Sequence, residues 1–307
     1  MPDVIVIGSL NMDLVVKTAR MPVGGETLLG EAFSTIPGGK GANQALAIAK
    51  MGGRVAIIGR VGRENFGESL RHNLEAGGVD VTQLKSDASA PTGVALIVVE
   101  AAGENRIIVV SGANFALTPA DIFEIEPFLI QARMLVVQFE VPMNVVAAAV
   151  RLAHQHGILT IVNAAPAHSI APELFPLIDY LVVNENEAGL LSEIKVTDIE
   201  SGRQAARRLV ARGARHVILT LGAQGALVRT AAEEFHVPGF SVHAVDTTAA
   251  GDAFIGGLVV SLLETLGCFQ DKVRFANAAG AIAATRFGAQ SSLPYRVEVE
   301  ALLANPS

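Results

Sequence analysis

The chain has 307 residues, of which half are hydrophobic and 17% are charged, and its formal net charge is −7. This length and apolar content allow one large domain or two domains with a substantial buried core. The acidic balance argues against a nucleic-acid backbone as the main partner, although a local site can still bind an anionic substrate. The only cysteine, Cys268, excludes an intrachain disulfide. We expect it to be a buried structural thiol.

The N-terminal segment is apolar but carries Asp3, Gly8 and Asp13 and has no basic region, so it is typical of a buried strand and not of a signal peptide. No run of eighteen apolar residues occurs in the sequence, so no membrane span is expected. The location that these features favour is the cytoplasm.

Apolar runs alternate with segments of helical spacing along most of the chain. The expected strands are 4–7, 54–61, 134–139, 158–162, 180–183 and 216–221. The expected helices are 41–51, 66–76, 144–156, 201–212, 253–266 and 271–285. Such alternation predicts an α/β fold in which helices cover both faces of a mainly parallel central sheet.

Two regions break the alternation, 13–33 and 93–110, because they are rich in β-forming residues and have no helix between their strands. Gly103, Glu104 and Asn105 are typical of a hairpin turn within the second region. We expect these regions to form a small separate sheet. Such a sheet cannot bury both of its faces alone, so it must cover the main domain, pair with another subunit, or do both.

The most informative segment is 245–254, in which Asp252 follows Ala249, Ala250 and Gly251 at the start of an apolar helix. The small residues leave their backbone N–H groups free to converge on an anion at the helix N-terminus. A carboxylate beside an anion site is useful if it takes a proton from a hydroxyl during phosphoryl transfer. The alternative is an acid that only stabilises the helix terminus.

A second segment, 38–44, is rich in glycine and ends in Asn43 and Gln44 at a helix start. It is not a Walker A loop because Gly41, and not Ser or Thr, follows Lys40. Its backbone would allow close approach of a ligand, although a glycine-rich helix start needed only for packing is the alternative.

Asn11 and Asp13 lie two residues apart after the first strand, so their side chains point to one side of an extended chain. Together with Asn43 they could bind several vicinal hydroxyl groups. An ordinary polar turn is the alternative for this pair.

Asn184 and Glu187 follow strand 180–183 at its carboxyl end, where ligands bind in open α/β sheets. The acid suits Mg²⁺ bound through water, and the same two residues could form a helix capping box. After strand 216–221, Gly222 and Gly225 would let a flat ring approach the backbone, or they form a tight turn into 226–228.

With these motifs in the same order, the chain resembles the ribokinase (PfkB-type) family of carbohydrate kinases over nearly its whole length. The two signatures of that family match residues 38–41 and 246–252, about two hundred residues apart. The resemblance implies a single ribokinase-like domain over 1–307, a three-layer α/β/α structure with a small β-sheet lid formed by about 13–36 and 93–111. The lid would pair with its copy in a homodimer.

The family resemblance also implies ATP-dependent phosphorylation of D-ribose at O5, with Asp252 as the catalytic base. The anion hole would be formed by Ala249, Ala250 and Gly251. The sugar would be bound by Asn11, Asp13, Gly39, Lys40, Asn43, Glu140 and Asp252. The nucleotide would be bound by Asn184, Thr220, Gly222, Gly225, Gly251 and Asn277.

Two metal ions are implied as well. Mg²⁺ would be ordered through water by Glu187. A monovalent cation, usually K⁺, would be bound by the side chains of Asp246 and Ser292 and by main-chain oxygens of Thr248, Ala283, Arg286 and Gly288.

Two alternatives remain open. The first is a kinase for another sugar or nucleoside, such as deoxyribose, fructose or adenosine. The second is a non-catalytic sugar-binding regulator, against which the intact Asp252 and anion hole argue, because a binding protein has no need of a base.

Overall fold

The structure is a computed structural model that describes residues 1–101, 105–264 and 267–305. The strands are β1 (Val4–Ile7), β2 (Asn11–Thr18), β3 (Ala32–Gly38), β4 (Val55–Gly62), β5 (Leu84–Asp87), β6 (Gly93–Glu100), β7 (Asn105–Val110), β8 (Met134–Val137), β9 (Leu159–Asn163), β10 (Tyr180–Val183), β11 (His216–Thr220), β12 (Ala226–Thr230) and β13 (Glu234–Val237). The α-helices are α1 (Lys40–Lys50), α2 (Asn65–Ala76), α3 (Pro119–Glu124), α4 (Glu126–Leu129), α5 (Met143–Gln155), α6 (Glu185–Ser192), α7 (Ile199–Ala211), α8 (Ala250–Leu263), α9 (Phe269–Ala284) and α10 (Arg296–Ala304). Short 3-10 helices span Gly112–Ala116, Pro172–Leu177 and Gly222–Gln224.

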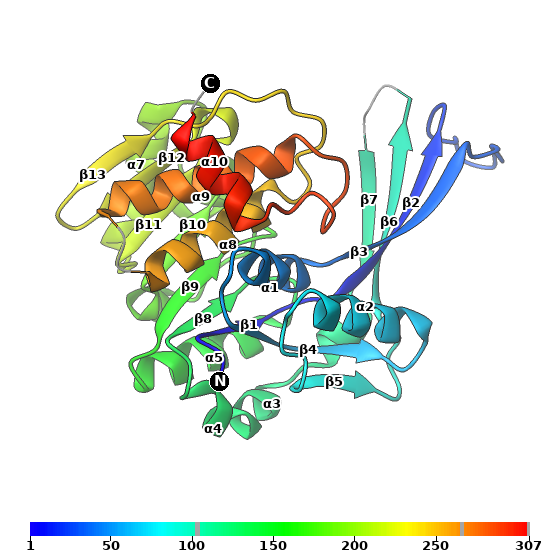
Figure 1. Cartoon of the computed structure of the whole chain (residues 1–307), viewed down its shortest axis with the longest axis horizontal. Coiled ribbons are helices and arrows are strands. Elements are labelled where there is room, and N and C mark those ends of the chain that lie inside the picture. The colour runs from blue at the N-terminus through cyan, green and yellow to red at the C-terminus, as the bar shows by residue number, and fades with distance from the viewer. Residues whose placement is uncertain (102–104, 265–266, 306–307) are drawn as a thin grey trace.

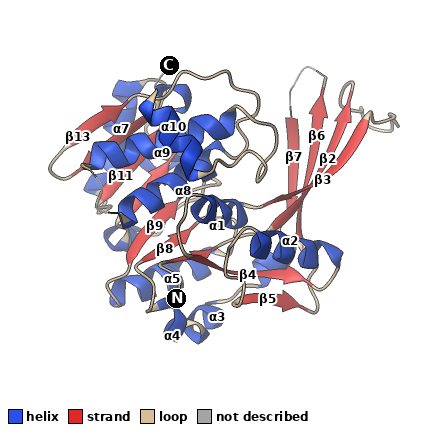
Figure 2. Ribbon diagram, viewed as in Figure 1, coloured by secondary structure: helices blue, strands red, loops and turns tan. Residues whose placement is uncertain are grey.

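The main sheet has nine strands in the order β13-β12-β11-β10-β9-β8-β1-β4-β5. Its strands from β11 to β5 pair in parallel, and β12 and β13 are added antiparallel at one edge. Helices lie on both faces of this sheet (Figures 1 and 2). The α/β fold predicted from the alternation of strands and helices is therefore confirmed.

Two apolar cores follow from the two faces of the sheet. In β1, Val4 and Val6 belong to the core beneath α1, α8 and α9, whereas Ile5 and Ile7 belong to the core beneath α5 and α7. Because successive strand residues point to opposite faces, a strand buried on both sides is apolar at every position. This is why the sequence of β1 is a continuous apolar run.

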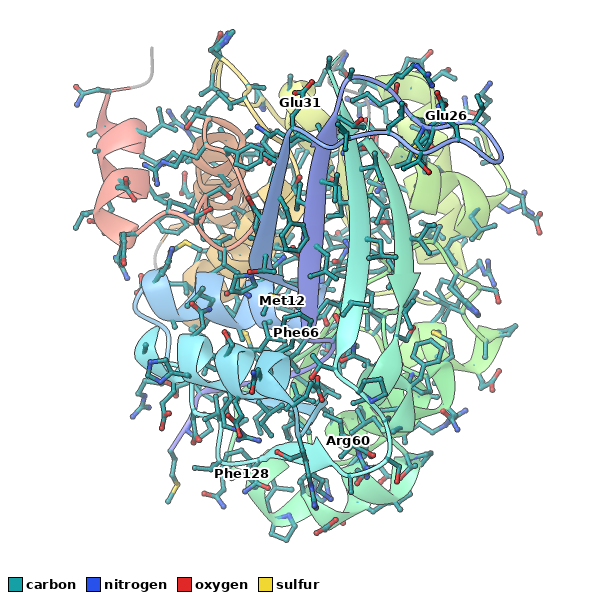
Figure 3. All side chains as sticks on the ribbon, turned by 90° about the vertical axis from the view of Figure 1, so that its right-hand side faces the viewer. Met12, Glu26, Glu31, Arg60, Phe66 and Phe128 are labelled. Atoms are coloured by element: carbon teal, nitrogen blue, oxygen red, sulfur yellow. The ribbon has the colours of Figure 1, made fainter. Side chains whose placement is uncertain are left out.

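The small sheet has the order β3-β2-β6-β7 and projects from one side of the main domain (Figure 1). In Figure 3 its strands lie side by side, with Met12 near the end next to the main domain and Glu31 toward the opposite end. Met12 is 3% exposed, whereas Phe33 is 64% and Ile108 is 63% exposed. The outer part of this sheet thus presents apolar side chains to solvent.

The expected elements are all present, most with ends displaced by one to three residues. Strand β8 stops at Val137, two residues before the expected end, and α8 starts at Ala250 and not at 253. The tight turn into 226–228, the alternative given for Gly222 and Gly225, is present: it joins β11 to β12, and these two strands pair antiparallel. The expected turn at 103–104, and residue 266, lie outside the described residues.

One prediction is wrong. Cys268 is exposed and not buried, because it lies at the N-terminus of α9, where its Sγ is 3.2 Å from Oδ2 of Asp271. Among the described residues, no helix is long and apolar enough to cross a membrane.

Candidate active site

A cavity of about 190 Å³ lies where the carboxyl ends of β9 and β10 meet the N-termini of α1 and α8. Its lining includes Lys40, Asn163, Glu187, Gly251 and Asp252. Residues that are far apart in the sequence meet here because strand ends of a parallel sheet lie at the same edge.

Asp252 is the third residue of α8 and is 4% exposed. Its Oδ2 accepts a hydrogen bond from Asn43 Nδ2 and its Oδ1 accepts one from Gln44 Nε2, both at 2.9 Å. Burial raises the pKa of Asp252, and the Lys40 ammonium and the two amide donors act in the opposite direction. A buried carboxylate with a raised pKa and an open side toward a cavity is suited to accept a proton.

Lys40 and Glu140 lie beside Asp252. The Lys40 backbone N–H donates to Glu140 Oε2 at 3.1 Å, and the Ser9 hydroxyl donates to the same oxygen. Burial acts to lower the pKa of Lys40, but the carboxylates of Asp252, Glu140 and Glu187 outweigh it and raise that pKa. The ammonium therefore stays charged and places one positive charge among several negative ones.

Asp13 points into the same region from β2. Burial, followed by the nearby carboxylates of Glu140 and Asp252, raises the pKa of Asp13 to about 7. A Cβ at Gly38 would lie 2.4 Å from Asp13 Oδ2, so only glycine leaves room for this carboxylate.

Asn11, two residues earlier, is 4% exposed, and its Oδ1 accepts a hydrogen bond from Asn114 Nδ2 at 2.8 Å. Asn114 also contacts the Leu10 backbone, through Leu10 N at 2.9 Å and Leu10 O at 3.1 Å. Sequence reasoning missed Asn114, which lies in the 3-10 helix Gly112–Ala116, because an isolated asparagine carries no distinctive spacing.

The glycines of 38–41 allow α1 to start directly against the first strands. Gly39 has a φ of 90°, and a Cβ there would lie 2.7 Å from the Asn11 backbone nitrogen. A Cβ at Gly41 would lie 2.6 Å from the Gly8 carbonyl carbon. Close packing therefore explains both glycines, and this packing brings Asn43 to Asp252. The interpretation of these glycines as packing residues is therefore compatible with a role in the site.

The small-residue turn before Asp252 differs in one respect from the expected anion hole. The Ala250 N–H donates to the Thr247 carbonyl at 3.2 Å. In the described part of the chain, the N–H groups of Ala249 and Gly251 have no backbone acceptor. A Cβ at Gly251 would meet no atom within 4 Å, so there is open space beside this residue. Two of the three expected donors are free in this structure.

A second cavity of about 640 Å³ adjoins the first, and both are lined by Asn184, Thr220 and Gly251. It is lined by every residue expected to bind the nucleotide, namely Asn184, Thr220, Gly222, Gly225, Gly251 and Asn277. Asn277 Nδ2 donates to the carbonyls of Val237 at 3.0 Å and Pro238 at 3.2 Å, which fixes the wall of the cavity. A cavity of this volume is within the range that accommodates a nucleotide-sized ligand.

Asn184 and Glu187 form the capping box of α6. Glu187 N donates to Asn184 Oδ1 at 2.9 Å, and Asn184 N donates to Glu187 Oε2 at 2.8 Å. Glu187 is nevertheless 5% exposed and lines the smaller cavity, where burial raises its pKa. Each carboxylate oxygen keeps a further lone pair, so the capping role leaves room for a metal-bound water.

Asp246, Thr248 and Gly288, three of the expected monovalent-cation ligands, are joined by hydrogen bonds next to the N-terminus of α8. Asp246 Oδ2 accepts from Gly288 N at 2.9 Å, and Asp246 Oδ1 accepts from Thr248 N at 3.0 Å. Although burial acts to raise it, hydrogen bonds from the Thr248 hydroxyl and from these two backbone N–H groups hold the pKa of Asp246 below its ordinary value. Ser292 Oγ donates to the Ala289 carbonyl at 2.8 Å. The donor set is all oxygen with one carboxylate, which suits a hard cation of low charge.

Most of the sequence-predicted site residues thus line the two cavities or bond directly to residues that do. Sequence reasoning missed Ser9, Gln44 and Gln138, which lie behind Glu140 and Asp252. Gln44 belongs to the 38–44 segment but was given no role there, and Gln138 lies between two apolar residues outside any motif.

Comparisons with known proteins agree with this arrangement. The sequence model described as pfkB family carbohydrate kinase matches residues 1–296. The ribokinase of Haemophilus influenzae is 39% identical over 293 residues, which cover 95% of this chain and 95% of that protein. The deoxyribokinase of Salmonella typhi is 38% identical, again with 95% of each chain covered. The structure of Arabidopsis thaliana ribokinase complexed with ribose and ATP has a TM-score of 0.91 and 29% identity, and the match covers 98% of both chains.

Proposed function

The chain belongs to the pfkB family of carbohydrate kinases, and we propose that it is a ribokinase, transferring the γ-phosphoryl group of ATP to O5 of D-ribose. The observation that carries the proposal is the position of Asp252 in the smaller cavity, directly after Gly251 in the chain. A carboxylate there lies next to a space for the acceptor and beside Gly251, which lines both spaces. This arrangement supports transfer between two bound substrates.

The sugar would bind beside Asp252 and Lys40, with its hydroxyls bound by Asn11, Asp13, Asn43 and Glu140 and by the backbone near Gly39. Asn43 Oδ1 is a buried acceptor that has no hydrogen-bond partner within the described residues. A buried acceptor without a partner is costly, so a ligand hydroxyl that donates to it would be favoured. This supports an acceptor substrate rich in hydroxyl groups.

The nucleotide would occupy the larger cavity, with its phosphates directed at Gly251. In the transfer step, Asp252 takes the proton of the attacking hydroxyl while the free N–H groups of Ala249 and Gly251 stabilise charge on the transferring group. Lys40 stabilises the same negative charge from the other side. When bound, Mg²⁺ would neutralise phosphate charge, and Glu187 is placed to orient its water ligands.

We propose the monovalent cation K⁺ for the site formed by Asp246, Ser292 and the carbonyls of Thr248, Ala283, Arg286 and Gly288. Asp246 is hydrogen-bonded to both the loop before α8 and Gly288, so this carboxylate already links the two segments. A cation beside it would fix the turn that carries Ala249 and Gly251, without contacting the substrate.

The whole chain would act as one domain with the small sheet as its lid over the sugar space, and the protein would be a homodimer. The exposed apolar side chains of Phe33 and Ile108 support pairing of this sheet with its copy. Lid closure would exclude water and prevent hydrolysis of ATP. A cytoplasmic location would supply the ATP.

The acceptor is tested by ADP release with Mg-ATP and D-ribose, 2-deoxyribose, fructose or adenosine, beside a control without sugar. The deoxyribose arm matters because relatives named for ribose and deoxyribose are almost equally similar. Ribose-dependent turnover that increases with K⁺ supports the whole proposal. Turnover with another acceptor alone contradicts the substrate, and the absence of turnover with every acceptor favours a sugar-binding regulator.

A further inference from the structure

Gln44 of α1 is fully buried and contacts the catalytic carboxylate from the interior of the protein. Its Nε2 lies 2.9 Å from Asp252 Oδ1 and 3.0 Å from Asn163 Oδ1. Its Oε1 accepts a hydrogen bond from Gln138 Nε2 at 2.7 Å. Both N–H groups and the carbonyl oxygen of this amide are therefore engaged.

The direction of these hydrogen bonds is fixed by the backbone of β10. Asn163 Nδ2 faces the Val182 carbonyl at 3.4 Å, and a backbone carbonyl can only accept. The Asn163 oxygen is then turned toward Gln44, which must present its NH₂ group to it. A reversed Gln44 amide would place its oxygen against those of Asn163 and Asp252 and its NH₂ against that of Gln138.

We propose that Gln44 is a positioning residue for phosphoryl transfer, and that Gln138 and Asn163 keep one Gln44 N–H directed at Asp252. The proposal rests on the function proposed above. Asn43 donates to the other carboxylate oxygen at 2.9 Å, so two consecutive residues of α1 restrain the carboxylate. Asn43 is also proposed to contact the sugar, whereas Gln44 and Gln138 are each 0% exposed and lie behind the cavity.

The charged groups around Asp252 define what the amide does. Burial and the Glu140 carboxylate favour the protonated form of Asp252, whereas Lys40, Asn43 and Gln44 favour the ionised form. The Asp13 carboxylate faces it from β2. Loss of the Gln44 N–H removes a donor to the ionised form, so the pKa of Asp252 rises. Because the base must be ionised, the loss of turnover on lowering the pH then begins at a higher pH than in the wild type.

The test is Gln44→Met, which preserves length and removes the amide. Turnover and KM for D-ribose are measured from about pH 5.5 to 9.5. We expect kcat near pH 7 to fall about 10- to 100-fold, as for other small misplacements of catalytic groups. The acid limb of the kcat profile should move upward by about one pH unit, with KM for ribose changed less than about 2-fold.

Gln138→Met should move the limb in the same direction by less, because Gln138 reaches Asp252 only through Gln44. The matched control is Thr160→Val on β9, the strand that carries Asn163. Thr160 is 0% exposed and hydrogen-bonds to the Leu177 carbonyl at 3.0 Å and to Asp179, far from the base. It should lower stability and leave the acid limb in place.

An unchanged acid limb and kcat in Gln44→Met would overturn the proposal, as would an equal shift in Thr160→Val. If Gln44→Met does not fold, Gln138→Met decides by the same criterion. Wild-type protein that does not phosphorylate ribose contradicts the proposed function instead. In that case the carbon-13 shift of the Asp252 carboxyl, assigned with Asp252→Asn and followed against pH, still tests whether Gln44 lowers its pKa.

Discussion

Asp13→Asn should make the protein more stable at high pH while weakening its affinity for ribose. The pKa of Asp13 is raised from 3.8 to about 7, chiefly by burial and then by the carboxylates of Glu140 and Asp252. The unfolded chain therefore releases this proton at a lower pH than the folded chain does. The stability that the protonated carboxyl provides is complete below about pH 4 and is lost as pH rises through about 7.

The magnitude follows from the two pKa values. A difference of about three pKa units corresponds to about 4 kcal/mol at roughly 1.4 kcal/mol per unit, reached in full above pH 7. About 2–3 kcal/mol of this loss of stability would occur between pH 5 and pH 8. Since Asp13 is partly exposed, solvent screening reduces the effect, and we expect about 2 kcal/mol.

The assay is urea unfolding of wild type and Asp13→Asn at pH 5 and pH 8, with ribose affinity measured in parallel. Asp121→Asn is the control. Although burial acts to raise it, hydrogen bonds from Lys85, Thr118 and Arg60 hold the pKa of Asp121 well below its ordinary value. The stability that Asp121 contributes is lost only as pH falls below about 4. Asp121→Asn should therefore lower the free energy of unfolding by the same amount at pH 5 and at pH 8. An equal effect of Asp13→Asn at both pH values would refute the reasoning.

Three further predictions follow from the site. Asp252→Asn should bind ribose with near-normal affinity and lose about 10²- to 10⁴-fold in kcat, the usual contribution of a general base; near-normal turnover in a coupled ADP assay would refute its assignment. Gly41→Ala should lower the free energy of unfolding by about 1–3 kcal/mol, because its Cβ would lie 2.6 Å from backbone atoms of Gly8, whereas Gly24→Ala, with nothing within 4 Å, should not; equal urea midpoints would contradict this. Cys268 is exposed, so one equivalent of a thiol reagent should react with the folded protein without loss of turnover, and a protected thiol would show the opposite.

The sequence predicted the parts of this molecule whose signal is local. Val4–Ile7 is apolar throughout because both of its faces are buried, and a helix start after small residues marked Asp252. Four of the residues expected around the nucleotide lie at or just after the carboxyl ends of β10 and β11, namely Asn184, Thr220, Gly222 and Gly225. They meet Gly251 of α8 and Asn277 of α9 in one cavity.

Other features depend on contacts that only the fold creates. Gln44 meets Gln138 across 94 residues and Asp252 across 208, so no spacing rule could pair them. Cys268 was expected to be buried from residue type alone, but its place at a helix N-terminus exposes it. The Ala250 N–H is engaged by Thr247, which depends on the turn geometry and not on the small size of the residues.

The most direct test of the central claim is the identity of the product formed from Mg-ATP and D-ribose. Phosphorus–proton correlation NMR of the reaction mixture shows which carbon carries the new phosphate, and ADP is counted in the same sample. Ribose 5-phosphate formed in equal amount to ADP by the wild type, and not by Asp252→Asn, is the predicted result. Phosphate on another hydroxyl, or ADP formed without a sugar phosphate, would contradict the account.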